Sequence, residues 1–297
     1  MIMKKRILLT GGSGFIGRNL RESYLTDKYD IFFPGHTELE LMDEDAVMHF
    51  IKHNRIEIIL HTAAKPGHRN SKDTSNLFYT NTRIFFNLAR NRDAIEKIIV
   101  IGSGAIYDNR FYQLKMPEEY FDEHVPMDEH GMSKYVMGKY IEHTDNIFDL
   151  RVFGIYGKYE DYSIRFISNM ICKALFDLPL TMNQDRMFDY LWVEDLMPII
   201  DHVIEHGLPW QSMNITPDRS VPLSILAKSV LSATGKDLQI LINTPGMGIE
   251  YSGSNARLKK ILPNIHFTEI ETGINILLSY YRLIKGTLDI ERLRIDK

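Results

Sequence analysis

The sequence has little that would support a disulfide-linked, metal-binding or membrane-spanning protein. Its 297 residues include one cysteine, Cys172, which excludes an internal disulfide and a thiolate metal site and is expected to be a buried structural thiol. The 11 histidines show no HExxH or other metal-ligand spacing, so we expect no metal. No apolar run approaches the ~20 residues that cross a bilayer, and the first residues lead into a glycine-rich turn without a signal-peptide core. We therefore expect a cytoplasmic protein that contacts no membrane.

An excess of positive charge is also missing. The chain has 35 basic and 39 acidic residues, a net charge of −4 and a sequence pI near 6.3. The basic residues are scattered, so we expect no nucleic-acid partner. The hydrophobic fraction of 44% and the charged fraction of 25% are those of an ordinary globular protein that can bury a full core.

One stretch, RILLTGGSGFIGRNL at residues 6–20, has the pattern of a strand, a tight turn and the start of a helix. Gly11, Gly14 and Gly17 are spaced three apart within it. A diphosphate can bind there to free backbone N–H groups and to the positive end of the helix dipole. The spacing is GxxGxxG and not GxGxxG, so an ordinary strand–helix turn is the alternative. We favour dinucleotide binding because the turn follows the first apolar segment and precedes a helical pattern.

The first half of the chain alternates short apolar segments with amphipathic patterns, which is typical of parallel βαβ units. We predict strands at residues 6–10, 30–34, 56–62, 97–102 and 149–153, and helices at 16–25, 43–53, 76–91 and 131–143. Strands such as IEIILHT and KIIVIGS are apolar at consecutive positions, as expected when helices cover both faces. The predicted fold class is α/β, with a Rossmann-type doubly wound parallel sheet whose ligands bind at the carboxyl edge.

After Gly157 the pattern changes to that of a smaller α/β lobe without a second glycine turn. We predict helices at 163–176, 223–234 and 272–285, a strand at 238–242, and a strand that leads into a helix within 188–207. The expected organisation is a dinucleotide-binding domain at residues 1–155, rejoined by 184–207. Residues 156–183 and 208–297 would then form a substrate lobe.

The loop after the second predicted strand bears on the type of cofactor. NAD-selective sites usually place an acidic residue there to accept the ribose 2′-OH, and this chain has Pro34, Gly35 and His36 instead. Without a carboxylate nothing repels a 2′-phosphate, and His36 with Arg18 can bind one, so we favour NADP over NAD. Both side chains can equally be solvated surface groups. Asp43 either caps the following helix or contacts the adenine.

Ser103 lies in IGSGAIYD, at the end of an apolar strand on the expected ligand edge. Its hydroxyl can donate to a substrate oxygen, although a serine in a turn is commonly a capping residue. Downstream, DEHGMSKYVMGK contains His130, Gly131, Ser133 and Lys134.

With these motifs the chain resembles the extended short-chain dehydrogenase/reductases that act on nucleotide sugars, the NAD-dependent epimerase/dehydratase family. The resemblance covers nearly the whole chain and is carried, in order, by TGGSGFIG, LMD with Asp43, HTAAK, GSGAIYD, LRVFGIYG, FDYLWVEDL and NITPDRSVPLSILA. Gly154 replaces the family's usual Asn, and Phe188 stands where an Arg is frequent. The resemblance implies a nucleotide-sugar substrate, a nicotinamide cofactor and a homodimer.

The catalytic helix departs from the family pattern. The family's YGxSK pairs an acid/base Tyr with a Lys, and here His130 occupies the Tyr position while Lys134 is in place. A literal YxxxK follows at Tyr135 and Lys139. We favour the His130 register because the Gly, Ser and Lys match as a block. Imidazole can act as a general acid/base, but the nearby ammonium of Lys134 would disfavour its protonated form.

The candidate site residues fall into three sets. The catalytic set is Ser103, His130 and Lys134. The cofactor-binding set is Gly11, Gly14, Phe15, Ile16, Gly17, Arg18, His36, Asp43, Ala63 and Lys134. The substrate-binding set is Ala105, Arg165, Asn169, Arg186 and Tyr251, each of which can instead be a surface or packing residue.

Three functions remain open from the sequence. We favour an NADP-dependent reductase of a 4-keto-6-deoxy sugar nucleotide, because ELELMD after the second strand resembles the GDP-fucose synthase-like branch. An epimerase or dehydratase with tightly bound NAD is the second. The third is a non-catalytic binder of cofactor or sugar nucleotide, created by loss of the Tyr.

Overall fold

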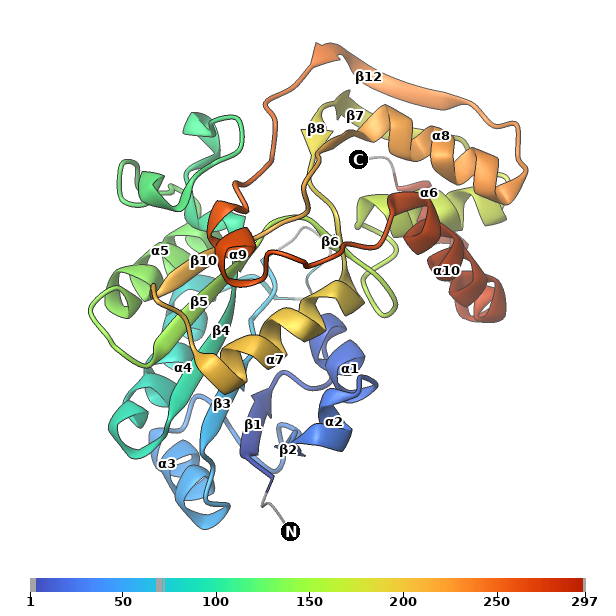
Figure 1. The fold of residues 1–297 in the computed structure, drawn as a ribbon. Coiled ribbons are helices and arrows are strands. Elements are labelled where there is room, and N and C mark those ends of the chain that lie inside the picture. The colour runs from blue at the N-terminus through green and yellow to red at the C-terminus, as the bar shows by residue number, and fades with distance from the viewer. Residues whose placement is uncertain (1–3, 68–70, 72, 296–297) are drawn as a thin grey trace.

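The computed structural model describes residues 4–67, 71 and 73–295, and its centre is a six-stranded parallel sheet (Figure 1). The strand order is β10-β5-β4-β3-β1-β2, and every pair is parallel. The strands are β1 (Arg6–Thr10), β2 (Asp30–Phe32), β3 (Ile58–His61), β4 (Lys97–Ser103), β5 (Ile147–Val152) and β10 (Ser212–Ile215). The strand order reverses between β1 and β3, which is where a doubly wound sheet binds its ligand. The predicted fold class is confirmed.

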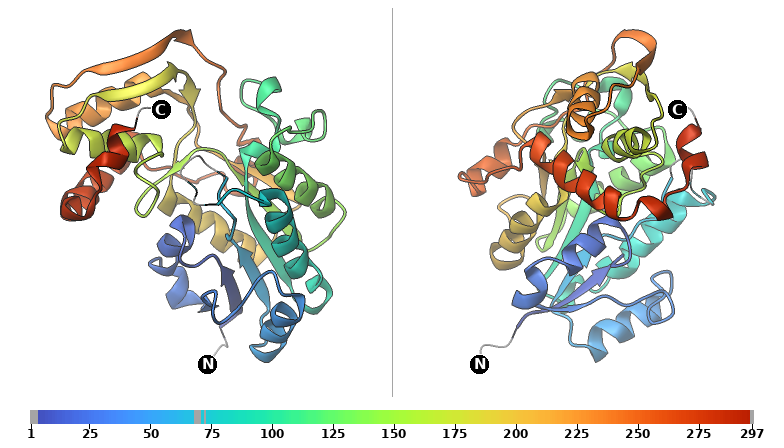
Figure 2. Two further views of the ribbon diagram at one scale, coloured as in Figure 1. Left: turned by 180° about the vertical axis from the view of Figure 1, so that it is seen from behind. Right: turned by 90° about the vertical axis from the view of Figure 1, so that its right-hand side faces the viewer.

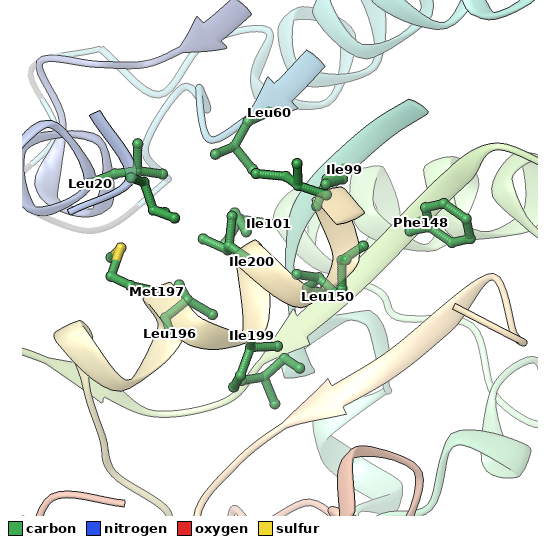
Figure 3. Packing of buried hydrophobic residues seen from close by; sticks show 14 of the residues in the cluster. Leu20, Leu60, Ile99, Ile101, Phe148, Leu150, Leu196, Met197, Ile199 and Ile200 are labelled. Atoms are coloured by element: carbon green, nitrogen blue, oxygen red, sulfur yellow. The ribbon is translucent and has the colours of Figure 1, made fainter. Parts of the chain in front are cut away.

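Helices cover both faces of this sheet (Figure 1). One face carries α3 (Glu44–His53), α4 (Leu77–Ala89) and α5 (Glu129–Ile141); the other carries α1 (Phe15–Arg21), α2 (Leu25–Lys28) and α7 (Leu196–His206). Successive strand residues point to opposite faces, so Ile98 packs under α3–α5 while Ile99 packs toward α7. Figure 3 shows the apolar side of α7 lying against the leucine and isoleucine side chains of the sheet. Burial on both faces is why these strands are apolar at consecutive positions.

A second lobe lies at the opposite end of the molecule from the N-terminus (Figure 2). Its helices are α6 (Phe166–Leu175), α8 (Leu223–Thr234), α10 (Ile270–Leu283) and α11 (Ile290–Arg294), which share one hydrophobic cluster. Three two-stranded sheets accompany them: β12 (Ile240–Met247) with β7 (Leu180–Asp185), β11 (Val221–Pro222) with β8 (Met187–Phe188), and β6 (Ile155–Tyr156) with β9 (Leu191–Trp192). Cys172 is buried within this lobe.

Two segments differ from the sequence-based expectation. The single helix predicted at 16–25 is divided into α1 and α2, because the chain turns at Ser23, whose Oγ donates to Leu20 O at 2.7 Å. Residues 212–215, which the sequence analysis placed in the substrate lobe, form β10 at the edge of the central sheet, with α9 (Ala256–Ile261) against it. This short strand has only two apolar residues, Met213 and Ile215, both fully buried, so periodicity alone did not reveal it. The division into two domains stays a prediction.

Candidate active site

The glycine turn joins β1 to α1 with close backbone contacts that only glycine permits. Gly11 has φ +73°, and a Cβ there would lie 2.7 Å from Ala63 N. A Cβ on Gly17 would lie 2.2 Å from Gly11 O. Gly14 is the N-cap of α1, and no side chain caps that helix. The first backbone N–H groups of α1 can therefore bind an anion.

A cavity of about 460 Å³ opens over this turn. Its walls come from the turn, from the loop after β2, and from Thr62 to Pro66 after β3. Of the candidate cofactor contacts, Gly11, Gly14, His36 and Ala63 line it. Phe15 and Ile16 lie in the first turn of α1 and pack on the core beneath it. A dinucleotide fits this cavity because its floor is backbone N–H and its side wall is apolar.

Arg18 and Asp43 are among the six candidate cofactor contacts that lie outside the cavity wall. The guanidinium of Arg18 lies 5.4 Å from the ring centroid of Tyr159. Asp43 is the N-cap of α3 and accepts a 3.0 Å hydrogen bond from Ala46 N. Both side chains therefore have structural partners in this conformation, and their contact with a cofactor stays a prediction.

The loop after β2 carries carboxylates that the sequence analysis did not weigh. Glu38 Oε2 accepts a 2.7 Å hydrogen bond from Gly35 N. This bond holds the negatively charged carboxylate of Glu38 near the end of β2. Glu40 lines the cavity, and its Oε1 accepts a 2.8 Å hydrogen bond from Met42 N. These charges lie where a 2′-phosphate would be unfavourable, which weakens the argument for NADP from a missing acid.

Lys134 is a buried residue of α5, and its charge interacts with Asp149 on β5 and with His61 on β3. Burial lowers its pKa, and the carboxylate of Asp149 opposes that shift. Its neighbour His61 ends β3 and exchanges a 2.8 Å hydrogen bond with Thr10 Oγ1 through Nδ1. Burial first, and then the charge of Lys134, lower the pKa of His61 to about 3. His61 is thus neutral, and it links Lys134 to the wall of the glycine-turn cavity through Thr62 and Ala63.

His130 lies in the first turn of α5, and its Nδ1 is buried without a hydrogen-bond partner among the described residues. Burial first, and then the positive charge of Lys134, lower the pKa of His130 to about 4. Arg165 lowers it further, and Asp128 opposes these effects. At neutral pH the imidazole is therefore uncharged.

The alternative YxxxK pair points elsewhere. Tyr135 donates a hydrogen bond to Asp122 Oδ1, and Lys139 Nζ lies 2.7 Å from Asp122 Oδ2. All three side chains lie at the protein surface. Lys134, by contrast, is buried, and its charge interacts with the buried side chains of His61 and His130. This burial favours the register with His130.

Ser103 ends β4, and its Oγ accepts a 3.1 Å hydrogen bond from Ala105 N. It also shares a hydrogen bond with the hydroxyl of Tyr251. Ala105 lies against the N-terminus of α5, since a Cβ on Gly131 would be 2.8 Å from Ala105 O. The serine thus caps a turn and still faces a side chain of the second lobe.

A second cavity, of about 500 Å³, lies in the second lobe, and three of the five candidate substrate contacts line it. Asn169, Arg186 and Tyr251 are in its wall, together with Tyr112 and Glu250. Asn169 Nδ2 donates to Tyr162 O at 3.1 Å, while its Oδ1 has no hydrogen-bond partner among the described residues. The Arg186 guanidinium lies 5.8 Å from the ring centroid of Phe188.

The other two candidate substrate contacts, Arg165 and Ala105, lie outside that wall. Arg165 is the N-cap of α6, between the lining residues Ile164 and Phe166, and its charge acts on His130 and Tyr251. Ala105 lies outside the wall, beside α5. Arg165 is therefore next to lining residues of the second cavity, and its charge still reaches His130 on α5.

Sequence reasoning missed two contributors to this site. Tyr112 comes from the loop after β4, donates a hydrogen bond to Gly104 O, and packs on Tyr251 with ring centroids 5.1 Å apart. No motif marked it. His61 was part of the HTAAK motif, but its burial beside Lys134 depends on packing between β3 and α5.

This chain is similar to known proteins over most of its length. Residues 7–216 match the family model of the NAD dependent epimerase/dehydratase family, which is more than half of the chain. The chain belongs to the NAD-dependent epimerase/dehydratase family. The family assignment made from the sequence is confirmed, and the family uses NAD or NADP.

Individual relatives are distant. GDP-L-colitose synthase of Yersinia pseudotuberculosis is 22% identical over 223 residues, which are 68% of this chain and 72% of the relative. Among solved structures, a GDP-mannoheptose C4 reductase from Campylobacter jejuni with NADP bound has a TM-score of 0.80 at 19% identity, covering 95% of this chain and 99% of that one. A UDP-glucose 4-epimerase from Thermotoga maritima with UDP-glucose has a TM-score of 0.79 at 19% identity, covering 94% and 99%. These structures share the fold, and the family as a whole indicates an enzyme that modifies nucleotide sugars.

Residues 4–67, 71 and 73–295 contain no candidate for a membrane-spanning helix or a metal site. None of their helices is long and apolar enough to cross a membrane. No group of three or more His, Cys, Asp or Glu side chains among them is arranged to hold a metal ion.

Proposed function

We propose that the protein is an NADP-dependent reductase of a 4-keto-6-deoxy sugar nucleotide. The observation that carries this proposal is a series of electrostatic interactions that leads from His61, next to the wall of the glycine-turn cavity, to Tyr251 in the wall of the second cavity. The charge of Lys134 lowers the pKa of both His61 and His130. The charge of Arg165 lowers the pKa of His130 and favours the phenolate of Tyr251, which lines the second cavity. A cofactor over the glycine turn and a nucleotide in the second lobe would meet along this series of side chains.

The residues divide into binding and polarising roles. The glycine turn and the N-terminus of α1 would hold the diphosphate of the cofactor, and Lys134 would hold its ribose. The bound cofactor supplies the hydride. Ser103 would donate a hydrogen bond to the ketone oxygen and stabilise the negative charge that develops on it. Arg165 and Arg186 would bind the diphosphate of the sugar nucleotide.

The names of similar proteins favour reduction over epimerisation. The GDP-mannoheptose C4 reductase supports reduction at C4 of the sugar, and it was solved with NADP. The carboxylate of Glu38 at the end of β2 is the observation on the other side, because it favours the 2′-OH of NAD. An epimerase with tightly bound NAD is therefore the second candidate.

Purified protein separates these candidates. The reductase should be isolated without stoichiometric NAD and should oxidise NADPH when given GDP- or dTDP-linked 4-keto-6-deoxy sugars. Protein that carries one NAD per chain and consumes no NADPH would refute the reductase and support the epimerase. Protein that binds NADPH and a nucleoside diphosphate sugar but turns over none of the panel would support a non-catalytic binder.

A further inference from the structure

The proton that completes a ketone reduction needs a donor, and His130 is poorly suited to supply it. Its pKa of about 4 leaves about one imidazolium in a thousand at pH 7. Neutral imidazole can donate only its far less acidic N–H proton. The family position of the acid/base group is therefore occupied by a side chain that holds no acidic proton at neutral pH.

A phenol lies on the other side of Ser103. The hydroxyl of Tyr251 shares a hydrogen bond with Ser103 and another with Tyr112. It reaches this place across Gly104, where a Cβ would lie 2.6 Å from the hydroxyl oxygen. Tyr251, which lines the second cavity, thus brings its hydroxyl to that of Ser103 at the end of β4.

The Tyr251 side chain is held firmly. Its backbone N donates to Met187 O at 3.0 Å, and its backbone O accepts from Asp189 N at 3.1 Å. Its ring packs against Phe153 and Phe188, with centroid separations of 5.2 and 4.7 Å. A side chain whose backbone is hydrogen-bonded and whose ring is packed in this way is positioned before substrate arrives.

We propose that Tyr251 is the proton donor of the ketone reduction, acting beside Ser103, and that His130 does not transfer the proton. This assignment rests on the proposed reductase function. As the hydride adds to the carbonyl carbon, the C=O π pair becomes a lone pair on oxygen, which takes the proton from Tyr251. The O–H bond of the phenol breaks, an O–H bond forms on the sugar, and water then reprotonates the phenolate.

The surroundings of the hydroxyl suit this role. Burial raises the pKa of Tyr251 to about 12, so the proton is present throughout the neutral range. Hydrogen bonding with the side chains of Tyr112 and Ser103, together with the charge of Arg165, favours the phenolate, while Asp189 opposes it. The charge of Arg165 stabilises the negative charge that remains after the proton leaves.

The kinetic test compares Tyr251→Phe with His130→Asn in NADPH oxidation with the 4-keto sugar panel. Tyr251→Phe should lower kcat by about a hundredfold or more with KM little changed. His130→Asn removes no acidic proton, so the pH dependence of kcat in this variant should match that of the wild type, whatever the change in kcat itself. Tyr190→Phe is the matched control: Tyr190 stacks on Phe188 in the same aromatic group, at a centroid distance of 4.7 Å.

A second variant and a second measurement test the assignment even if Tyr251→Phe misfolds. Gly104→Ala keeps both hydroxyls but places a Cβ against that of Tyr251, so it should also lower kcat. In the apoprotein with ¹³Cζ-labelled tyrosine, the Tyr251 resonance, assigned by its loss in Tyr251→Phe, should stay protonated at pH 10 and shift in Ser103→Ala.

The outcomes separate the two proposals. An inactive wild-type protein refutes the reductase function itself. An active protein in which Tyr251→Phe keeps its kcat, or in which His130→Asn changes the pH dependence of kcat, overturns the assignment of Tyr251 alone. If the Tyr251 resonance has the same chemical shift in Ser103→Ala as in the wild type, the contact between Tyr251 and Ser103 on which the assignment depends is absent.

Discussion

Replacing Gly17 with Ala tests the glycine turn directly. The new Cβ would lie 2.2 Å from Gly11 O and 2.7 Å from Gly12 Cα. An ordinary C···O contact is about 3.3 Å, so α1 must move away from the turn by about 1 Å. Both neighbours are backbone atoms, and no side-chain rotation can relieve the contact.

The magnitude follows from overpacking and from the lost anion contact. Overpacking of this kind costs about 1–3 kcal/mol, which lowers the midpoint of thermal unfolding by several degrees. Displacing α1 also spoils a hydrogen bond to a charged phosphate worth about 1.5–3 kcal/mol, so NADPH should bind about ten- to a hundredfold more weakly.

The assay is titration of NADPH by its fluorescence, with thermal unfolding of the apoprotein in parallel. Gly286→Ala is the control, because a Cβ there meets nothing within 4 Å. If Gly17→Ala binds NADPH as tightly as the wild type while remaining folded, the diphosphate does not lie on this turn and the reasoning fails.

Three further predictions concern side chains around the cofactor cavity. Glu38→Gln removes the carboxylate at the end of β2 and should raise the ratio of NADPH to NADH affinity about three- to tenfold, whereas Asp45→Asn on α3 should not; equal ratios in both would contradict the role of Glu38. Lys134→Met should weaken NADPH binding by about tenfold, and Lys139→Met, whose ammonium pairs at the surface, should change it less than about twofold; the reverse order would support the other register. His61→Gln should flatten the loss of stability in acid: the folded pKa of His61 is about 3, so between pH 6.5 and 3 only the unfolded chain binds this proton, and stability falls as pH falls by up to about 1.4 kcal/mol per unit. Urea unfolding across that window measures the slope, and an unchanged slope would show that His61 is not buried as a neutral group.

Much of the fold was readable from short-range patterns. Apolar runs alternating with helical periodicity predicted five of the six central strands, and the spacing of the glycines located the turn over which the cavity opens. Such features depend on neighbours in the chain, which a sequence displays directly. The strand β10 escaped because its pairing with β5 joins residues about sixty apart and needs no long apolar run.

The sequence by itself determined the fold class, the family, the glycine turn and the presence of Ser103, His130 and Lys134 at motif positions. Only the tertiary structure decided which groups face one another. It buries Lys134 while Lys139 pairs at the surface, returns the carboxylate of Glu38 to the end of β2, and brings Tyr251 to Ser103 across Gly104. The reason is physical: burial and the electrostatic partners of a side chain are set by the packing of distant segments, which the order of residues does not show.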